Sequence, residues 1–280
     1  MPKPLRTVLL LALLAAGSPP ALRAQAPAPS DSSLLIVFEH DQPVANERNY
    51  YTNMGDSIIV AAVTHRQFKD AKGVMHPFRK TMMLVVDSHD LGLIRYFSNQ
   101  GFDGHQISRG VLPGDTSMTY FIELDGGGDA DRVVQPPGRL FVMDSQMFSL
   151  FDVLCRSVVN KTFETRRVQV IALTTDSLAA PLATLASAGF DTLRLGKATV
   201  RAHHYTFEDP SARFDLWADP KGRLVRLTHA ESGLRVERAP DEAPRPATAA
   251  KKPAAKPANS AGKPANPAGK PPAKPPSSAH

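Results

Sequence analysis

The histidines are the residues best suited to metal binding or proton transfer, and their spacing favours neither chemistry. His203 and His204 are neighbours in a stretch of strand composition, where successive side chains point to opposite faces, so they cannot chelate one metal ion together. The sequence contains no HExxH or similar spacing that would hold zinc. We therefore expect no metal or other cofactor, and we expect structural or exposed roles for the scattered His40, His65, His76, His89, His105 and His229.

Three aspartates beside a glycine run superficially resemble a calcium loop. Asp125, Asp129 and Asp131 surround three consecutive glycines, but the bidentate glutamate of a calcium loop is missing. Ordering the glycines would also cost entropy, and glycine runs between strands are usually connections. The stretch predicts a hairpin loop, with calcium binding as the less favoured alternative.

The potential nucleophiles lack the surroundings that would activate them. No serine lies in a GxSxG turn, and no Walker or GxGxxG motif occurs. Cys155 is the only cysteine, so no intramolecular disulfide can form. It falls on the apolar side of a predicted helix, where a buried, inert thiol is favoured over a nucleophile. The sequence gives no reason to expect an enzyme.

The N-terminal residues have the pattern of a secretory signal peptide. Lys3 and Arg6 precede an apolar run from Val8 to Ala16, and small residues follow up to Ala24. The apolar run is too short to span a bilayer, so no transmembrane segment is expected. No cysteine near the cleavage point would carry a lipid anchor. We expect residues 1–24 to be removed, residues 25–32 to form a short linker, and the protein to be periplasmic or secreted.

The C-terminal residues, 239–280, are mostly proline, alanine and lysine. Such a segment cannot offset its ordering entropy and is expected to remain a disordered tail. The tail and the signal peptide together carry more than the whole formal charge of +6, so the residues between them are slightly acidic. We therefore expect no specific nucleic-acid surface on the domain. The basic tail either contacts an anionic envelope component or acts as a solvated spacer, which its composition favours.

Residues 33–238 are long enough for one domain and read mainly as short strands joined by tight turns. Residues 176–189 fit a helix or a strand, and Pro181 inside the segment favours a strand followed by a turn at Gly189. Turns are predicted at 54–56 and 219–222. The predicted strands lie at 34–39, 58–64, 81–87, 93–98, 117–124, 165–173, 200–208, 213–219, 223–228 and 234–238.

Residues 144–160 give the strongest helical pattern in the chain. Asp144 or Ser145 is expected to cap the start of this helix, and Asn160 is expected to end it in the left-handed conformation. The period of 3.6 places Gln146, Ser149, Asp152 and Arg156 on the polar side. The opposite side holds the apolar residues Met147, Phe148, Leu150, Phe151, Leu154, Cys155 and Val158.

A single amphipathic helix among many strands has to be buried by a sheet. The sequence therefore predicts a mainly β (α+β) fold, in which a curved antiparallel half-barrel sheet wraps around one main helix. Three segments in this order, FEHDQPVANERNYY, VMDSQMFSLFDVLCR and FDLWADPKGRLVRLTH, resemble an uncharacterised family of exported bacterial proteins. The curved sheet of that family is similar to the half-barrel of the outer-membrane lipoprotein carriers. The resemblance implies the half-barrel and, by analogy of fold alone, a concave face that holds acyl chains.

Seven large side chains are candidates for the lining of a pocket between sheet and helix. Such a pocket would hold a hydrophobic or lipid-like ligand by burial, worth roughly 25 cal/mol per Å². Large apolar residues are mostly interior, so a place in a filled core is favoured for each of these side chains. A filled core would instead favour a structural or interaction scaffold whose basic tail binds a partner. The candidates are Tyr50, Met83, Tyr96, Tyr120, Phe148, Phe151 and Trp217.

Overall fold

The computed structural model describes residues 28–69, 72–102, 104–173 and 178–240. The predicted signal peptide and the tail from residue 241 onward lie outside the described residues. All described residues belong to one compact unit, Met1–Asp241. The first strand begins at Asp31, within the segment expected to be a linker.

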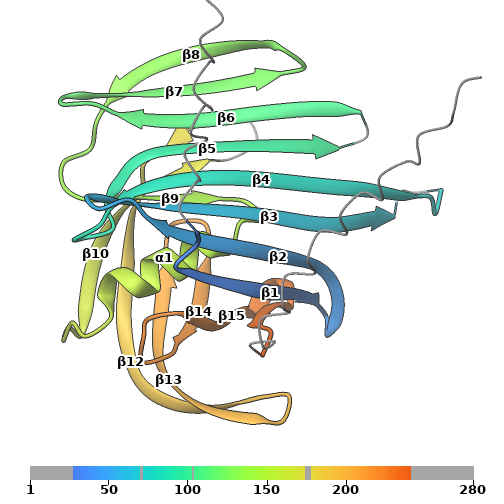
Figure 1. Ribbon diagram of the computed structural model, residues 1–280, viewed down its shortest axis with the longest axis vertical. Coiled ribbons are helices and arrows are strands. Elements are labelled where there is room, and N and C mark those ends of the chain that lie inside the picture. The colour runs from blue at the N-terminus through green and yellow to red at the C-terminus, as the bar shows by residue number, and fades with distance from the viewer. Residues whose placement is uncertain (1–27, 70–71, 103, 174–177, 241–280) are drawn as a thin grey trace, which may run out of the picture. The chain divides into compact units, whose positions relative to one another are not determined.

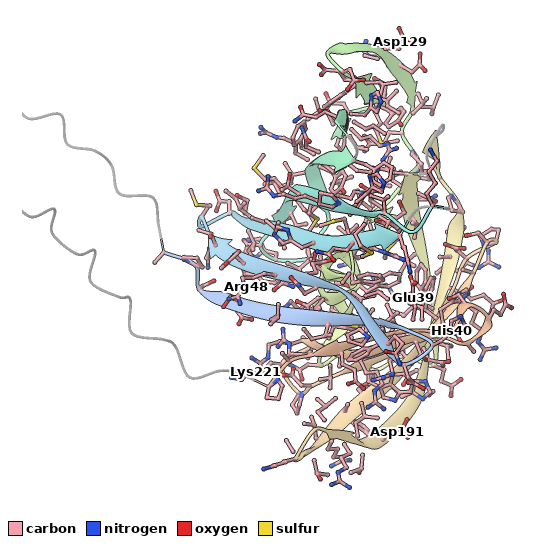
Figure 2. The ribbon with its side chains drawn as sticks, turned by 90° about the vertical axis from the view of Figure 1, so that its right-hand side faces the viewer. Glu39, His40, Arg48, Asp129, Asp191 and Lys221 are labelled. Atoms are coloured by element: carbon pink, nitrogen blue, oxygen red, sulfur yellow. The ribbon has the colours of Figure 1, made fainter. Side chains whose placement is uncertain are left out.

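Sixteen strands form one curved sheet that does not close on itself. Fifteen of them follow the order β11-β10-β12-β13-β14-β15-β16-β1-β2-β3-β4-β5-β6-β7-β8, and β9 pairs with β10. Neighbouring strands are antiparallel, except that β9 runs parallel to β10. Asp129 in β8 and Asp191 in β12 lie toward opposite ends of the sheet (Figure 2). The predicted mainly β, half-barrel fold is confirmed.

Four of the strands on the N-terminal side, β1, β3, β4 and β5, are longer than the sequence patterns predicted, and β7 has the predicted bounds. The strands on this side are β1 (Asp31–Glu39), β2 (Gln42–Asn53), β3 (Ser57–Lys69), β4 (Met75–Asp87), β5 (Leu93–Phe102), β6 (His105–Pro113), β7 (Ser117–Leu124) and β8 (Gly127–Val134). Strand β6 was not predicted, because Gly110 interrupts its pattern. That glycine is required, because the ring of Phe121 occupies the place of a Cβ. Residues 125 and 126 form the tight turn of the β7–β8 hairpin, which confirms the hairpin predicted there. The predicted loop was too long, because Asp129 and Asp131 lie within β8.

The remaining strands belong to the same sheet, with β9 before the helix and β10 to β16 after it. They are β9 (Leu140–Asp144), β10 (Thr165–Leu173), β11 (Leu178–Ala179), β12 (Leu182–Leu195), β13 (Ala198–Glu208), β14 (Arg213–Ala218), β15 (Leu224–His229) and β16 (Leu234–Arg238), with a 3-10 turn at Ala230–Ser232. Strand structure at β11 and in the first half of β12 confirms the strand preferred for this region. The predicted turn at Gly189 is wrong, because β12 continues through that residue with only a shift of register. Pro181 lies between β11 and β12, where its missing N–H costs no ladder bond.

The helix, α1, spans Ser149–Val158 and lies between the two limbs of the curved sheet (Figure 1). One apolar cluster joins it to β10 and β12–β16, and a second joins it and β9 to β2–β7. Because both sides of a ten-residue helix are covered, nine of its ten residues are buried. The prediction of a solvent-facing side is therefore wrong: Ser149 and Asp152 are completely buried.

The ends of α1 differ from the predicted caps. Asp144 and Ser145 do not cap the helix, because the chain at 144–148 forms the end of β9 and a turn before α1 begins. Asn160 does adopt the predicted left-handed conformation, with φ of 60°. The helix is thus shorter than predicted, and its first free N–H groups are capped by Glu47 of β2.

Candidate functional site

The connection between β9 and α1 is a tight turn fixed by buried polar contacts. The N–H of Met147 donates to the carbonyl oxygen of Asp144 at 3.2 Å, and Gln146 has φ of 64°. Positive φ at the third residue of such a turn normally calls for glycine or asparagine. The hydroxyl of Thr64 donates to the carbonyl oxygen of Gln146 at 3.1 Å, which ties the turn to β3.

A buried ion pair anchors the start of this turn. The ammonium of Lys80 lies 2.5 Å from Asp144, and both side chains are fully buried. Tyr96 and Ser98 donate their hydroxyls to the same carboxylate at 2.6 and 2.9 Å. Burial lowers the pKa of Lys80, while the carboxylate of Asp144 opposes the shift. A buried pair that is fully hydrogen-bonded fixes geometry more than it adds stability.

Glu47, on β2, caps α1 from a distant part of the sequence. Its carboxylate accepts the N–H groups of Phe148 and Ser149, each at 2.7 Å. Burial raises the pKa of Glu47, and these N–H donors act against the increase. A carboxylate at this place satisfies two of the free N–H groups and complements the positive end of the helix dipole. The sequence carries no local signal for this cap, since it comes from 101 residues upstream.

A cavity of about 400 Å³ lies beside the start of α1. Its wall is mostly apolar, whereas Glu39, Arg66 and Asp209 supply charge around it, and Asp144 lines it as the partner of the buried Lys80. Glu39 lies at the end of β1, next to His40 (Figure 2). The full lining, hereafter the apolar cavity, is Glu39, Arg66, Met143, Asp144, Ser145, Gln146, Met147, Phe148, Phe151, Ala172, Phe207, Asp209, Ser211, Ala212, Phe214, Ser232 and Leu234.

Aromatic rings from α1, β13 and β14 form the apolar part of this wall. Phe151 makes an edge contact with Phe207, with ring centroids 5.7 Å apart, and a tilted contact with Phe214 at 5.0 Å. The alternation of β13 and the register of β13 with β14 bring Phe207 opposite Phe214. The sequence analysis missed Phe207 and Phe214, although their strands were predicted, because strand composition alone does not tell which strands face the helix.

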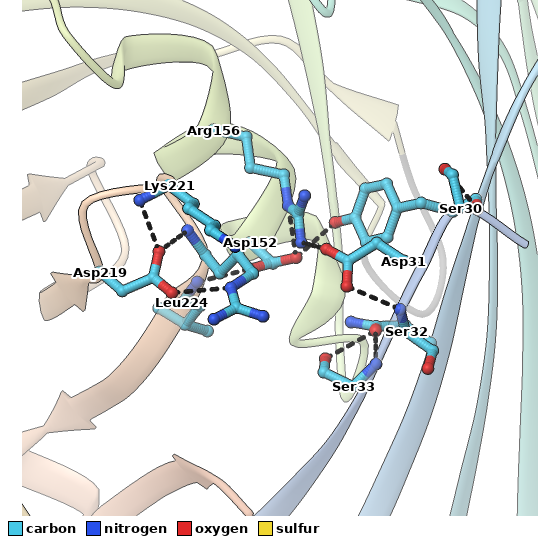
Figure 3. A network of polar contacts seen from close by, with 12 residues as sticks. Ser30, Asp31, Ser32, Ser33, Asp152, Arg156, Asp219, Lys221 and Leu224 are labelled. Carbon is cyan, nitrogen blue, oxygen red and sulfur yellow. Dashed lines mark hydrogen bonds and ion pairs between the residues drawn. The ribbon is translucent and has the colours of Figure 1, made fainter. Parts of the chain in front are cut away.

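The middle of α1 is held by a polar network around Asp152 (Figure 3). Its carboxylate accepts the hydroxyl of Tyr51 at 2.5 Å, the Nε–H of Arg156 at 3.0 Å and the backbone N–H of Leu224. Arg156 also lies 2.6 Å from Asp31 and over the ring of Tyr51. Burial and the nearby Asp152 raise the pKa of Tyr51 well above its ordinary value. This network joins the helix to β1, β2 and β15.

A second cavity, of about 540 Å³, lies at the other end of α1 and contains a serine–histidine pair. The Oγ of Ser187 lies 2.7 Å from Nε2 of His203, whose Nδ1 lies 3.1 Å from the hydroxyl of Tyr205. Burial lowers the pKa of His203. In a hydrolytic triad, a carboxylate at this nitrogen stabilises the imidazolium. Here the neutral hydroxyl of Tyr205 takes that place, so the arrangement lacks the carboxylate of a triad. His204 lies on the opposite face with Asp215, as the strand alternation predicted.

The structure places only two of the seven candidate residues in the apolar cavity, Phe148 and Phe151. Tyr96 and Tyr120 are buried on the same inner face of the sheet, within the core beside β9. Tyr96 is there as a hydrogen-bond donor to Asp144. The sequence reasoning missed Gln146 as a wall residue, because it was assigned to the exposed side of the helix.

The other three candidates lie on the opposite face of the sheet from the helix. The inward residues are Tyr51, Leu84 and Leu216, so their neighbours in sequence, Tyr50, Met83 and Trp217, point outward. Trp217 stacks on His204 and donates its indole N–H to Asp191 at 2.8 Å. A shift of one residue exchanges the faces of a strand, and adjacent large residues leave the choice open in the sequence.

Within the described ranges, no group of three or more His, Cys, Asp or Glu side chains is placed to hold a metal ion. Cys155 is buried, and burial raises the pKa of its thiol, as expected for an inert core cysteine. None of the helices among the described residues has the length and apolar character needed to cross a membrane.

Comparison with known proteins finds similarity only among solved structures. No protein-family model and no curated protein matches the chain. One similar structure is a β-barrel-like protein of the domain of unknown function DUF1849 from Brucella abortus, with a TM-score of 0.49 and 7% identity over 74% of this chain and 93% of that chain. Another is a DUF1089 family protein from Pseudomonas aeruginosa, with a TM-score of 0.40 and 11% identity over 79% and 95% of the two chains.

Proposed function

We propose that this chain is an exported, non-enzymatic protein that binds a hydrophobic or lipid-like ligand in the apolar cavity. The observation that carries the proposal is the cavity beside α1, with a volume of about 400 Å³ and a mostly apolar wall. Small-molecule sites commonly measure roughly 300–1,000 Å³ and combine an apolar wall with a few polar groups. The apolar cavity has this composition.

The side chains of the wall suit an apolar ligand. Aromatic rings at Phe148, Phe151, Phe207 and Phe214 offer large apolar contact areas, and burial contributes roughly 25 cal/mol per Å². Methionine adapts its shape to irregular ligands, and Met143 and Met147 lie in the same wall. The export part of the proposal, to the periplasm or the medium, rests on residues 1–24 alone.

The test is ligand retention by protein purified from its own envelope, measured by native mass spectrometry and followed by uptake of fluorescent fatty acids. Ala212→Phe places a ring in the cavity wall and should abolish uptake. Ala188→Phe adds the same ring at an exposed position outside that wall and should leave uptake unchanged. A clean unliganded mass with no uptake by the unmodified protein would refute the proposal.

A second candidate function, an envelope scaffold, is favoured by the extent of the core. The two apolar clusters fill the space on both sides of α1, so much of the concave face is packed against protein. In this case the basic tail would bind an anionic envelope component. Deletion of residues 241–280 separates the candidates: a carrier keeps its ligand, whereas a scaffold loses envelope association, and high salt mimics that loss.

A further inference from the structure

The inner face of β13 continues past the end of α1 and forms part of the wall of the cavity of about 540 Å³. Tyr205 belongs to the apolar cluster that includes the helix, and alternate residues of a strand share a face, so His203 and Arg201 lie on the same side. Tyr205 is buried, His203 is half-buried and Arg201 is exposed. The β12–β13 hairpin extends beyond the helix (Figure 1), so the exposed end of this face is available to a ligand.

Stacked rings hold the guanidinium of Arg201 at the exposed end of this face. The ring of His203 stacks on Tyr205 with centroids 4.2 Å apart and contacts the ring of Phe190 at 4.5 Å. The guanidinium of Arg201 lies 4.6 Å from the centre of the Phe190 ring. Among the residues that the structure describes, no carboxylate pairs with Arg201, so its N–H groups remain available as donors.

The hydrogen bonds of His203 leave the hydroxyl of Ser187 as a second donor. Burial raises the pKa of Tyr205 to about 12, so its hydroxyl keeps its proton at neutral pH. This hydroxyl donates to Nδ1 of His203, the acceptor that the described residues offer it, at 3.1 Å. Burial lowers the pKa of His203, so the neutral imidazole carries its proton on Nε2 and donates to Oγ of Ser187 at 2.7 Å. The hydroxyl hydrogen of Ser187 is then free to bind a ligand in the cavity that this residue lines.

The charged groups of the wall favour an anionic ligand. Asp219 lines the cavity, but its carboxylate is paired with the Nε–H of Arg223 at 2.7 Å. Lys161 lines the same cavity, and its ammonium donates to the carbonyl oxygen of Ser157 at 2.6 Å, which carries no formal charge. The positive charges of Lys161 and Arg201 are therefore not balanced by a carboxylate of the wall, and they attract an anion.

The two donors lie at different points along the cavity. The register of the β12–β13 hairpin pairs Phe190 with His203 and places Ser187 and Arg201 on opposite sides of that pair. A ligand that reaches both donors must therefore carry two acceptor groups, separated by a body that lies against the rings.

We propose that this cavity binds an elongated organic acid, with its carboxylate on the guanidinium of Arg201 and a neutral hydrogen-bond acceptor on the hydroxyl of Ser187. The apolar body of the ligand lies against the rings between these two donors. A single guanidinium suits a head with one negative charge, which it binds through parallel N–H groups. Among the described residues, none lines both this cavity and the apolar cavity, so the inference is independent of the proposed lipid-like ligand.

Isothermal titration calorimetry with three aromatic probes tests the two contacts separately. The probe para-acetamidobenzoate carries a carboxylate and an amide carbonyl at opposite ends of a ring. Acetanilide lacks the carboxylate, and para-propylbenzoate lacks the carbonyl. The unmodified protein should bind para-acetamidobenzoate about 10-fold more tightly than acetanilide and about 5-fold more tightly than para-propylbenzoate, as expected for a charged and a neutral hydrogen bond.

Variants assign each preference to its residue. Arg201→Gln should lose the preference over acetanilide, because the charge that holds the carboxylate is removed. Ser187→Ala should lose the preference over para-propylbenzoate, whereas Ser187→Thr keeps the hydroxyl and should retain it. Arg194→Gln removes a charge from an exposed position of β12 outside the cavity wall and should change neither preference. Arg201 is exposed, so Arg201→Gln decides the inference even if Ser187→Ala fails to fold.

Equal binding of the three probes by the unmodified protein would overturn the inference, as would failure of every probe to bind. A preference that persists in the variant designed to remove it would do the same. Ala212→Phe, in the wall of the apolar cavity, should leave the binding of para-acetamidobenzoate unchanged. Loss of binding in that variant would place the probe in the apolar cavity and overturn the inference. The proposed function is tested separately, by retention of fluorescent fatty acids.

Discussion

At the scale of single residues, the position that departs most from its sequence pattern is Asp152. The helical period assigns it to the polar side, yet its side chain is fully buried and receives donors from Tyr51, Arg156 and Leu224. Arg238 adds a second positive charge at 3.9 Å. A polar residue within a helix pattern is consistent with exposure or with a buried network, and the partners that decide between them come from distant strands.

Asp152→Ala is expected to destabilise the domain by about 3–5 kcal/mol, the usual cost of removing one partner from a buried charge network. The loss leaves the hydroxyl of Tyr51 and the backbone N–H of Leu224 without their acceptor, and it removes one of the two carboxylates that Arg156 contacts. Urea unfolding measures it. Asp129→Ala, at an exposed position on β8, is the control and should stay within about 0.5 kcal/mol. Similar values for both variants would contradict the network.

The stability that this network contributes depends on pH through the carboxylate of Asp31. Burial would raise its pKa, but the hydrogen bond and charge of Arg156 outweigh burial and lower the pKa below 3.8. Because the folded-state pKa is the lower one, the contribution of Asp31 is present above pH 3.8 and is lost as the pH falls through the folded value. Asp31→Asn should therefore be less stable than the unmodified protein at neutral pH.

The stability difference between Asp31→Asn and the unmodified protein should shrink progressively in acid. Urea unfolding at several pH values on both sides of 3.8 measures this. A difference that stays constant across that range would mean that the ion pair with Arg156 is not the origin of the effect.

At the scale of elements, α1 depends on contacts from other strands at both ends. Glu47 of β2 caps its start, and the turn between β14 and β15 packs on its end. At Gly222 the φ is 79°, and an added Cβ would lie 2.9 Å from the Cα of Arg156 and from the Cβ of Val159. A ten-residue helix is marginal in water by itself, so these contacts decide whether it forms.

Gly222→Ala is expected to lose stability twice, through left-handed backbone strain of about 1–2 kcal/mol and through overpacking of about 1–3 kcal/mol. Gly55→Ala is the matched control, because Gly55 has φ of 90° with nothing within 4 Å of an added Cβ. It should show the strain alone. Calorimetric melting of the two variants gives the difference, and equal losses would mean that the turn does not press on the helix.

The sequence predicts where the helix and strands lie better than it predicts which side chains of each element point toward the core. Period-two alternation and turn residues located most strands, the β7–β8 hairpin and the helix. They did not decide which of Tyr50 and Tyr51 points inward, because both are large and amphipathic and the register of β2 depends on its partner strands. The apolar cavity was unpredictable for a related reason, since its wall combines residues from strands far apart in the chain.

At the scale of the whole domain, Phe151 belongs to both the core and the cavity. It is 8% exposed, lies in the larger apolar cluster and also lines the cavity. The sequence analysis treated packing in the core and lining a pocket as alternatives, but Phe151 does both.

Phe151→Ala should cost about 3–5 kcal/mol of unfolding free energy, since the lost ring contacts leave a larger void. It should also reduce retention of an apolar ligand. Phe190→Ala, at a position 60% exposed, is the control and should change neither strongly. Urea unfolding and ligand uptake, measured on the same preparations, test both effects. A loss of uptake without a loss of stability would place Phe151 outside the core.

The pairing of β1 with β16 constrains the order in which the sheet can be completed. Val37 lies opposite Val236, so the two ends of the domain meet within the sheet. When the chain is released from its N-terminus onward, β1 can pair with β2 at once. The other edge of β1 then has no partner strand until β16 has also been released. Open edges invite pairing with other chains, and long-range pairings form slowly. Completion of this sheet is therefore a late event, and any factor that shields the waiting edge of β1 would raise the yield of folded protein.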